Sequence, residues 1–166
     1  MPRVVIVFQP LDPDVTLPTR GTVGSAGFDL RARIRGRKIK QFRSDGSTVT
    51  VECDGDRYRV DSGARILVPL GFCTELPVGF EVQIRARSSV AVQRGLIIPN
   101  APATIDTDYR AEWMVPLLNL SSIAVEVIHN ERIAQAVVMA YGEAEWRIGI
   151  PSPSTRAGGF GSTGPD

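Results

Sequence analysis

The chain has 166 residues, of which 43% are apolar and 22% charged, and its formal net charge is +1. This length suits one domain with a sizeable core, and the composition is that of an ordinary soluble globular protein. A net charge near zero provides no overall field for nucleic acid or a membrane surface. The apolar runs all fall short of the roughly 20 residues of a membrane span, so we expect a cytoplasmic protein with no membrane partner.

Short apolar runs rich in Val and Ile follow one another along the chain, separated by Gly, Pro, Asn or Asp. In chain order they are VVIVF, STVTVEC, ARILVPLGFCTEL, GFEVQIRA, WMVPLLNL, AVEVIH and IAQAVVMA. This pattern is typical of an all-β protein with many short strands. Sustained helical periodicity is absent, and we predict only one helical turn, near Val90–Arg94. The pattern leaves a closed barrel and a jelly roll open as architectures.

The segment from Arg31 to Val60 is strongly basic and contains two Asp-Gly turn signals, SDGS and CDGD, which predict hairpin connections. Its first part, RARIRGRKIKQFR, holds seven basic residues in thirteen and no acid. The alternation of Arg31, Arg33, Arg35 and Arg37 predicts that these side chains share one face of a strand. That face is either a solvated surface or a patch for a polyanion such as nucleic acid.

The cysteine and histidine content argues against two common kinds of catalysis. Cys53 and Cys73 lack the spacing of metal ligands and predict neutral or buried thiols, not a disulfide framework. The single histidine, His129, lies in the turn-like stretch VIHNER, and a Ser-His or Cys-His mechanism would have to use it. With no G-x-S-x-G motif and no His-rich cluster, nucleophilic triads and zinc chemistry are disfavoured.

Four other stretches place polar side chains in turns or at the ends of expected strands. They are SAGFDL with Asp29, RARSSVA with Arg87, Ser88 and Ser89, PNAPATIDTDYRAEW with Asp106, Asp108 and Tyr109, and NERIAQ with Gln135. Arginines, Ser hydroxyls and Gly-flanked amides bind polyphosphate oxygens. Carboxylates suit a partly hydrated Mg²⁺ or can orient a water. Since no P-loop motif is present, this inventory predicts hydrolysis of a nucleoside triphosphate without a P-loop.

The end of the chain has a different composition from the rest. From Pro151 it reads PSPSTRAGGFGSTGPD, and Pro, Ser, Thr and Gly cannot build a core. We therefore expect one domain over residues 1–150 and a flexible arm over residues 151–166. The single aromatic of this arm, Phe160, could cover a base when the arm closes.

Five stretches together resemble the motifs of the trimeric dUTP pyrophosphatases, the dUTPases. AGFDL, RSSVA, ATIDTDYR, ERIAQ and RAGGFGSTG occur in the order and approximate spacing of that family, between Ala26 and Gly164. The resemblance implies a distorted jelly roll of the β-clip type and a homotrimer whose three active sites are each built from all three subunits. It implies Mg²⁺-assisted attack of water on the α-phosphorus of dUTP, giving dUMP and pyrophosphate. That reaction keeps uracil out of DNA and supplies dUMP for thymidylate synthesis.

The resemblance also implies a role for individual residues. Asp29 would hold Mg²⁺ through water, Asp106 would activate the attacking water, and Tyr109 would pack on the deoxyribose and exclude a 2′-hydroxyl. The implied substrate contacts are Arg87 and Ser88 on phosphates, Gln135 near the phosphates, Asn100 on the uracil, Phe160 stacked on the uracil and Arg156 at the γ-phosphate. Ser89, Ile105, Gly161 and Ser162 complete the implied substrate-binding set.

The sequence departs from the family pattern at several positions. Ser89, Ala103 and Ala111 stand where the family usually has Gly, and Ala would be strained if the hairpin needed a positive φ there. The arm arginine, Arg156, is one residue nearer the paired glycines than usual. The basic hairpin over about residues 33–56 is extra to the pattern and holds no motif residue. We therefore expect that a short turn could replace it in a folded, active trimer.

Two alternatives to a dUTPase stay open. RSSVA also resembles the corresponding motif of the dCTP deaminases, which have the same fold and use a Glu on the strand after the third motif. Pro116 stands where that Glu is expected, which argues against deamination. The second alternative is a non-catalytic nucleotide-binding or regulatory member of the fold that uses the basic hairpin.

Overall fold

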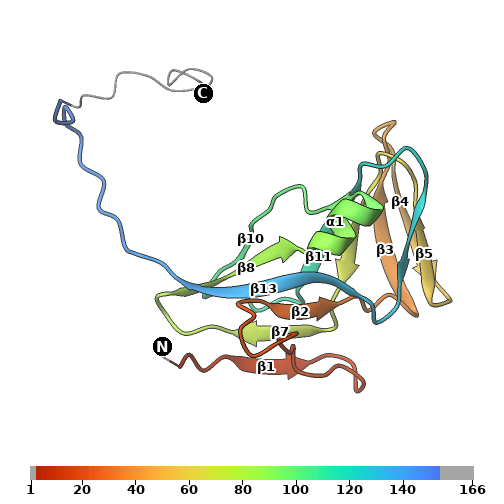
Figure 1. The fold of residues 1–166 in the computed structure, drawn as a ribbon, viewed down its shortest axis with the longest axis horizontal. Helices are drawn as coiled ribbons and strands as arrows, with labels where there is room; N and C mark the ends of the chain where they lie inside the picture. The colour runs from red at the N-terminus through yellow and green to blue at the C-terminus, as the bar shows by residue number, and fades with distance from the viewer. Residues whose placement is uncertain (1–2, 154–166) are drawn as a thin grey trace.

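The structure is a computed structural model in which residues 3–153 are described (Figure 1). The first half of the described chain forms β1 (Val7–Pro10), β2 (Phe28–Arg31), β3 (Arg37–Phe42), β4 (Thr48–Cys53), β5 (Arg57–Val60), β6 (Arg65–Pro69) and β7 (Phe72–Glu75). The second half forms β8 (Phe80–Ala86), α1 (Ser88–Arg94), β9 (Leu96–Ile97), β10 (Ala103–Ile105), β11 (Met114–Asn119), β12 (Val125–Ile128) and β13 (Arg132–Ala140).

Two antiparallel sheets make up most of the fold. One has the strand order β10-β8-β13-β2 and the other the order β4-β3-β6-β11-β9, and the pairs β1-β7 and β12-β5 lie beside them. Both large sheets are open, with different strands at their two edges. The all-β prediction is therefore confirmed, and a closed barrel is not formed by the described residues.

A single hydrophobic core joins the two large sheets. It includes Leu30 and Ile84 from the four-stranded sheet, and Ile66 and Val115 from the five-stranded sheet. Strand β11 alternates half-buried and buried side chains along its whole length, as the period-two geometry of a strand requires. Since residues from β2 to β13 share this core, the described chain is one folded body up to the end of β13.

The one helix of the described residues, α1, lies where the helical turn was predicted and begins two residues earlier. It ends at Gly95, which has a φ of +65° and donates its backbone N–H to the carbonyl of Ala91. A glycine is favoured at this left-handed position because other residues are strained there. Val90 is buried and fixes the helix to the core. Among residues 3–153, no helix is long and apolar enough to cross a membrane.

One of the two predicted Asp-Gly hairpins forms and the other does not. Asp45 and Gly46 lie in the turn that joins the paired strands β3 and β4. Asp54 and Gly55 connect β4 to β5, but β5 pairs with β12 and not with β4. The second prediction was wrong because a distant strand provides the partner for β5, which a local turn signal cannot indicate.

The prediction that four arginines share one strand face was also wrong. Strand β2 ends at Arg31, and a turn closed by Gly36 interrupts the chain before β3 begins at Arg37. The φ of Gly36 is +65°, a value that breaks an extended strand. Arg33 lies in this interruption and is buried, while Arg31 and Arg35 are exposed. The four guanidinium groups therefore do not form a continuous basic face.

The basic hairpin is part of the core, which contradicts the expectation that it could be replaced by a short turn. Strand β3 pairs with β6 of the five-stranded sheet as well as with β4. Ile34 and Ile39 are completely buried, and Cys53 is 4% exposed. Removing residues 33–56 would take a strand out of the sheet and expose the core beneath it, since apolar area must be buried for the fold to be stable.

A pair of substitutions in β3 tests this integration. Ile39→Ala should lower the free energy of unfolding by about 2–5 kcal/mol, because it opens a cavity in a packed core. Lys38→Ala changes the neighbouring exposed side chain and should cost less than about 0.5 kcal/mol. Urea denaturation at one fixed protein concentration measures both. If both substitutions lowered the free energy of unfolding by a similarly small amount, the hairpin would not be part of the folded core.

The surroundings of the two cysteines and of the histidine suit structural roles. Cys53 and Cys73 are free thiols, as predicted, and burial raises the pKa of Cys53. The Nδ1 atom of His129 accepts the backbone N–H groups of Ile34 and Arg35, at 3.2 and 3.1 Å. Partial burial, followed by the charges of Arg33 and Arg35, lowers the pKa of His129. A neutral imidazole therefore ties the turn before β3 to the turn before β13.

Candidate functional site

The carboxylate of Asp29 lies between two guanidinium groups. Its Oδ1 is 3.3 Å from Nε of Arg87, and its Oδ2 accepts a hydrogen bond of 3.1 Å from Nη1 of Arg132. Arg87 also donates to the backbone carbonyl of Arg132, at 3.3 Å. Asp29 comes from β2, Arg87 follows β8, and Arg132 opens β13. The antiparallel pairing of β13 with both other strands explains how three distant segments meet.

Gln135 belongs to the same end of the four-stranded sheet. It pairs with Asp29 on β2 and with Arg85 on β8. Its Nε2 donates to the carbonyl of Ala86 at 3.2 Å. A Cβ atom at Gly27 would lie 2.5 Å from the side-chain oxygen of Gln135, which real Cβ atoms do not tolerate. Gly27 is thus needed for this side chain to keep its position beside Asp29. We call Asp29, Arg87, Arg132 and Gln135 the charged cluster.

The positions that carry Ser or Ala in place of the usual Gly are not strained. Ser88 and Ser89 open α1 and are exposed next to the charged cluster, while Ala103 begins β10 and Ala111 lies before β11. Within residues 3–153, Asn130 alone among non-glycine residues has a positive φ. The concern about strain at Ala103 and Ala111 is therefore unfounded, because the backbone does not adopt a left-handed conformation there.

A second group of motif residues lies in the loop after β10, over residues 106–110. The backbone N–H of Tyr109 donates to the carbonyl of Asp106, which closes a turn and leaves the Asp106 side chain exposed. The hydroxyl of Tyr109 donates to the carbonyl of Glu112 at 3.0 Å, and the residue remains 37% exposed. The loop therefore holds an exposed carboxylate and an anchored, solvent-accessible aromatic ring.

The strand before this loop is suited to recognition by its backbone. Strand β10 forms the edge of its sheet, so one side of its N–H and C=O groups has no strand partner. The side chain of Ile105 is buried, at 7% exposure, and only its backbone can reach a ligand. Asn100 is exposed in the turn that leads into β10.

The charged cluster and the Asp106 loop lie at opposite ends of β8. Gln135 contacts the carbonyl of Ala86 at one end, and Thr107 donates to the carbonyl of Phe80 at the other. Phe80 and Ala86 are six residue steps apart along the extended strand β8, which corresponds to about 20 Å. One copy of the chain therefore does not bring the two groups of motif residues together.

After β13 the chain leaves the body of the protein as an extended segment (Figure 1). Residues 141–153 are all exposed, and the large apolar side chains of Trp146, Ile148 and Ile150 are 94%, 109% and 100% exposed. Alternate positions carry these apolar side chains, as on one face of a strand. The predicted arm residues Arg156, Phe160, Gly161 and Ser162 lie outside the described part of the chain.

The donor atoms of the described chain are compatible with a hydrated Mg²⁺, but they do not form a closed metal cage. No group of three or more His, Cys, Asp or Glu side chains within residues 3–153 could hold a metal by itself. Mg²⁺ is commonly bound by one or two carboxylates together with substrate phosphates and several waters. Asp29 offers one such carboxylate, with a side chain that is 16% exposed.

Comparison with known proteins places the chain in a family. The dUTPase family model matches residues 54–164. The chain belongs to the dUTPase family. Deoxyuridine 5′-triphosphate nucleotidohydrolase from Treponema pallidum is 42% identical over 154 residues, which cover 92% of each chain. The protein of that name from Solibacter usitatus is 40% identical over 165 residues, covering 98% of this chain and 97% of its own.

Solved dUTPase structures share the fold. The crystal structure of the dUTPase from Streptococcus mutans aligns with a TM-score of 0.64 and 25% identity, covering 84% of this chain and 99% of that one. A dUTPase of Staphylococcus bacteriophage 80alpha aligns with a TM-score of 0.75 and 16% identity, covering 96% of this chain and 98% of its own. The predicted jelly roll is thereby confirmed.

Sequence reasoning missed two members of the site. Arg132 lies within the ERIAQ stretch, but its side chain was not singled out until its contact with Asp29 was seen. Gly27 lies within AGFDL, and its importance comes from the Gln135 side chain on another strand. Their position inside two motifs was the available signal, because a charged residue or a glycine at a motif position often has a geometric role.

Proposed function

We propose that the protein hydrolyses dUTP to dUMP and pyrophosphate by attack of a water on the α-phosphorus. The observation that carries the proposal is the charged cluster, in which two arginines hold the carboxylate of Asp29 at the end of one sheet and Gln135 is its cross-strand neighbour. Membership of the dUTPase family supports it. In the cell this activity would keep uracil out of DNA and provide dUMP for thymidylate synthesis.

The charged cluster is the proposed binding site for the triphosphate. Arg87 and Arg132 each carry a fixed positive charge, and their side chains are 24% and 45% exposed, so both remain accessible to a ligand. Guanidinium groups bind phosphate oxygens through strong charge-assisted hydrogen bonds. The exposed hydroxyls of Ser88 and Ser89 add uncharged donors beside them. Neutralising the phosphates is the main requirement of phosphoryl-transfer catalysis.

Magnesium is the proposed cofactor. When bound, it would shield the negative charge of the phosphates and align them for attack. Asp29 is the residue that would hold it through water, since its carboxylate keeps 16% of its side-chain surface exposed and lies within the proposed phosphate site.

Asp106 is the proposed catalytic base. Its carboxylate is exposed in a loop that is fixed by the turn to Tyr109 and by the hydrogen bond from Thr107 to Phe80. A carboxylate in such a fixed loop can orient a water and accept its proton as the water attacks. His129, the single histidine of the chain, has its Nδ1 occupied by two backbone N–H groups and is not needed for this step.

Selectivity is proposed to come from the β10 edge and from Tyr109. Backbone N–H and C=O groups around Ile105 and the side chain of Asn100 can pair with uracil, and cytosine would leave some of these polar groups unpaired. The anchored ring of Tyr109 would pack on the deoxyribose and leave no space for a 2′-hydroxyl. In the arm, Phe160 would stack on the base, Arg156 would contact the γ-phosphate, and Gly161 and Ser162 would complete the closed site.

A homotrimer with shared active sites is the proposed assembly. The roughly 20 Å between the charged cluster and the Asp106 loop prevents one copy from forming a complete site. A neighbouring copy can supply the missing group if the subunits associate around an axis. The exposed Trp146, Ile148 and Ile150 also favour association, because large apolar side chains in an extended segment gain stability when a neighbour covers them.

The two alternatives predict different products. Deamination of dCTP would release ammonia, and Pro116, which is half-buried in β11 and pairs with Leu67 of β6, provides no carboxylate for it. A non-catalytic nucleotide-binding member would release neither ammonia nor pyrophosphate. Incubation of the protein with dUTP and, separately, with dCTP, with both products assayed, distinguishes the three. Pyrophosphate from dUTP alone is the expected result.

Substituting the proposed base should separate catalysis from binding. Asp106→Asn should lower the rate of dUTP hydrolysis by about 10²-fold or more, because an amide cannot accept the proton of the attacking water. Binding of dUTP, measured by calorimetry, should change little. Asp108→Asn is the matched control, since it removes an exposed carboxylate from the same loop and should keep near-normal turnover. Normal turnover of Asp106→Asn would remove this residue from the catalytic role.

Removing the arm should separate assembly from activity. Deletion of residues 152–166 should leave the melting temperature and the solution mass of the assembly almost unchanged, because β13 ends at Ala140. Turnover should fall at least about tenfold, since a hydrogen bond to a charged group contributes roughly 1.5–3 kcal/mol. Deletion of residues 163–166 alone retains Arg156 and Phe160 and serves as the control. A fully active long deletion would show that the arm only extends the chain.

A further inference from the structure

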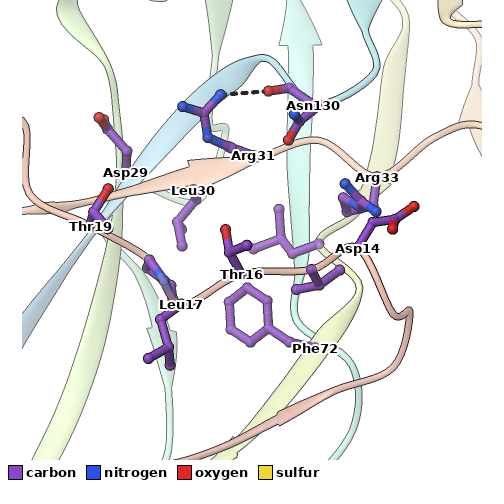
Figure 2. A pocket seen from close by; sticks show the side chains of 13 residues that line it. Asp14, Thr16, Leu17, Thr19, Asp29, Leu30, Arg31, Arg33, Phe72 and Asn130 are labelled. Atoms are coloured by element: carbon purple, nitrogen blue, oxygen red, sulfur yellow. Dashed lines mark hydrogen bonds between the residues drawn. The ribbon is translucent and has the colours of Figure 1, made fainter.

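A cavity of about 140 Å³ lies at the edge of β2, beneath the segment Asp14–Thr19 (Figure 2). We call this segment the strap. The strap carbonyl of Thr19 accepts the backbone N–H of Asp29 at 2.8 Å, so one end of the strap is fastened to the strand. Leu30 and Phe72, both buried, form part of the cavity wall. The volume is comparable to the roughly 150 Å³ that accommodates a benzene-sized ligand in other proteins.

Arg33 lines this cavity, and its guanidinium has no hydrogen-bond or ion-pair partner within residues 3–153. The residue is only 8% exposed, and its Nε is buried without a hydrogen-bond acceptor. No ion pair or side-chain hydrogen bond of this guanidinium is formed with the described chain. Its place is fixed, because its backbone N–H donates to the carbonyl of Pro69 at 2.8 Å. A buried N–H without an acceptor is unfavourable, and more so on a charged group, so an acceptor from outside the described chain is expected to pair with this guanidinium.

The neighbouring carboxylates do not provide that partner. Asp29 is paired with Arg87 and Arg132, and Asp12 is paired with Arg37 at 3.1 Å. Asp14 lines the same cavity but is exposed, and it forms no ion pair within 4.0 Å of any described residue. In Figure 2, Arg33 and Asp14 lie toward one end of the cavity, and Asp29 and Thr19 toward the other.

Other hydrogen-bond donors surround the cavity. Thr16 and Thr19 of the strap and Arg31 of β2 all line it. Nη1 of Arg31 donates to the carbonyl of Asn130 at 2.7 Å, which holds this second guanidinium at the rim. Alternate N–H groups of a strand point to the same edge, so the N–H of Arg31 points toward the strap, as that of Asp29 does. Hydroxyls, guanidinium groups and a backbone N–H are the donors that bind tetrahedral oxyanions.

We propose that the cavity beneath the strap binds a phosphate-sized oxyanion through Arg33. This site adjoins the proposed triphosphate site, because Asp29 lines the cavity as well, but it uses a different arginine. Arg33 belongs to the turn after β2, whereas Arg87 follows β8 and Arg132 opens β13. The bound anion would neutralise the buried guanidinium and connect the strap to β2. The proposal does not depend on the proposed hydrolysis of dUTP.

Thermal unfolding with inorganic phosphate as the probe tests the proposal. The full chain is melted in phosphate and in chloride of equal ionic strength, at one protein concentration. Wild-type protein should melt about 2–5 °C higher in phosphate, because a ligand that binds only the folded state stabilises it. Arg33→Met should lose most of this rise while keeping normal dUTP turnover. It should be at least as stable as wild type in chloride, because it removes an unpaired buried charge.

Two further variants locate the effect. Asp14→Asn should keep or increase the rise in phosphate, because it removes a negative charge that opposes the anion. Arg132→Met, which changes the proposed triphosphate site, should retain the part of the rise that Arg33→Met loses. The proposal is overturned if wild type gains nothing from phosphate, or if Arg33→Met gains as much as wild type. It is also overturned if Asp14→Asn destabilises the protein in chloride and loses the rise, because Asp14 would then be the partner of Arg33.

A measurement on the wild-type protein covers the case in which Arg33→Met does not fold. Hydrogen exchange of the strap amides, residues 15–17 and 19, should slow by about tenfold or more in phosphate relative to chloride, because a bound anion holds the strap against β2. Exchange at the amide of Tyr58 should slow less and serves as the internal reference, because Tyr58 lies on β5 and does not line the cavity. Equal exchange of the strap in the two salts would contradict the proposal.

Discussion

The ion pair of Asp29 with Arg87 and Arg132 is the interaction on which the proposed active site depends. Two guanidinium groups repel one another, and the carboxylate between them lets both stay at the same end of the sheet. The three residues come from β2, the end of β8 and the start of β13. They therefore come together only when these strands pair correctly. A ligand with several negative charges can then bind to arginines that are already in place, at a smaller entropic cost.

The same sheet also limits what one chain can do. The strand β8 separates the charged cluster from the Asp106 loop by about 20 Å. Within one subunit each of these two halves of the proposed site is held in place, but the halves cannot approach one another. Symmetric association is the simple means of joining them. The exposed apolar residues after β13 fit this view, since they have no partner in the described chain and extend away from its body (Figure 1).

Much of the fold could be predicted from the sequence, because short apolar runs and turn residues report local preferences. The strands that coincide with apolar runs, such as β8, β11 and β13, the helical turn and the SDGS hairpin followed from such signals, whereas the short strands β2, β9 and β10 were not predicted. The pairing of β5 with β12 did not, since it depends on residues about 70 positions apart. The prediction that the alternating arginines share one strand face failed for a similar reason. Gly36 has a positive φ and breaks the strand, and the side chain of Arg33 is buried.

For the site, too, residue types could be predicted from local sequence, whereas contacts between distant strands could not. Motif residues such as Asp29, Arg87 and Gln135 could be selected from the sequence because their types suit phosphate and metal chemistry. The part of Arg132 in holding Asp29, and the need for Gly27 beside Gln135, could not be predicted, since both arise from contacts across strands. The unpartnered guanidinium of Arg33 was equally hidden, because only the packing of the strap over β2 encloses it.

Complementation between two inactive variants tests most directly the central claim, that an active site joins the charged cluster of one chain to the Asp106 loop of another. One parent carries Asp106→Asn and the other Arg87→Gln, and the two are unfolded, mixed in equal amounts and refolded together. Random assembly should restore about one quarter of the wild-type dUTP turnover, because one site in four then receives an intact residue of each kind from neighbouring chains. A mixture that remains as inactive as its parents would contradict the claim and place both groups in a site formed by a single chain.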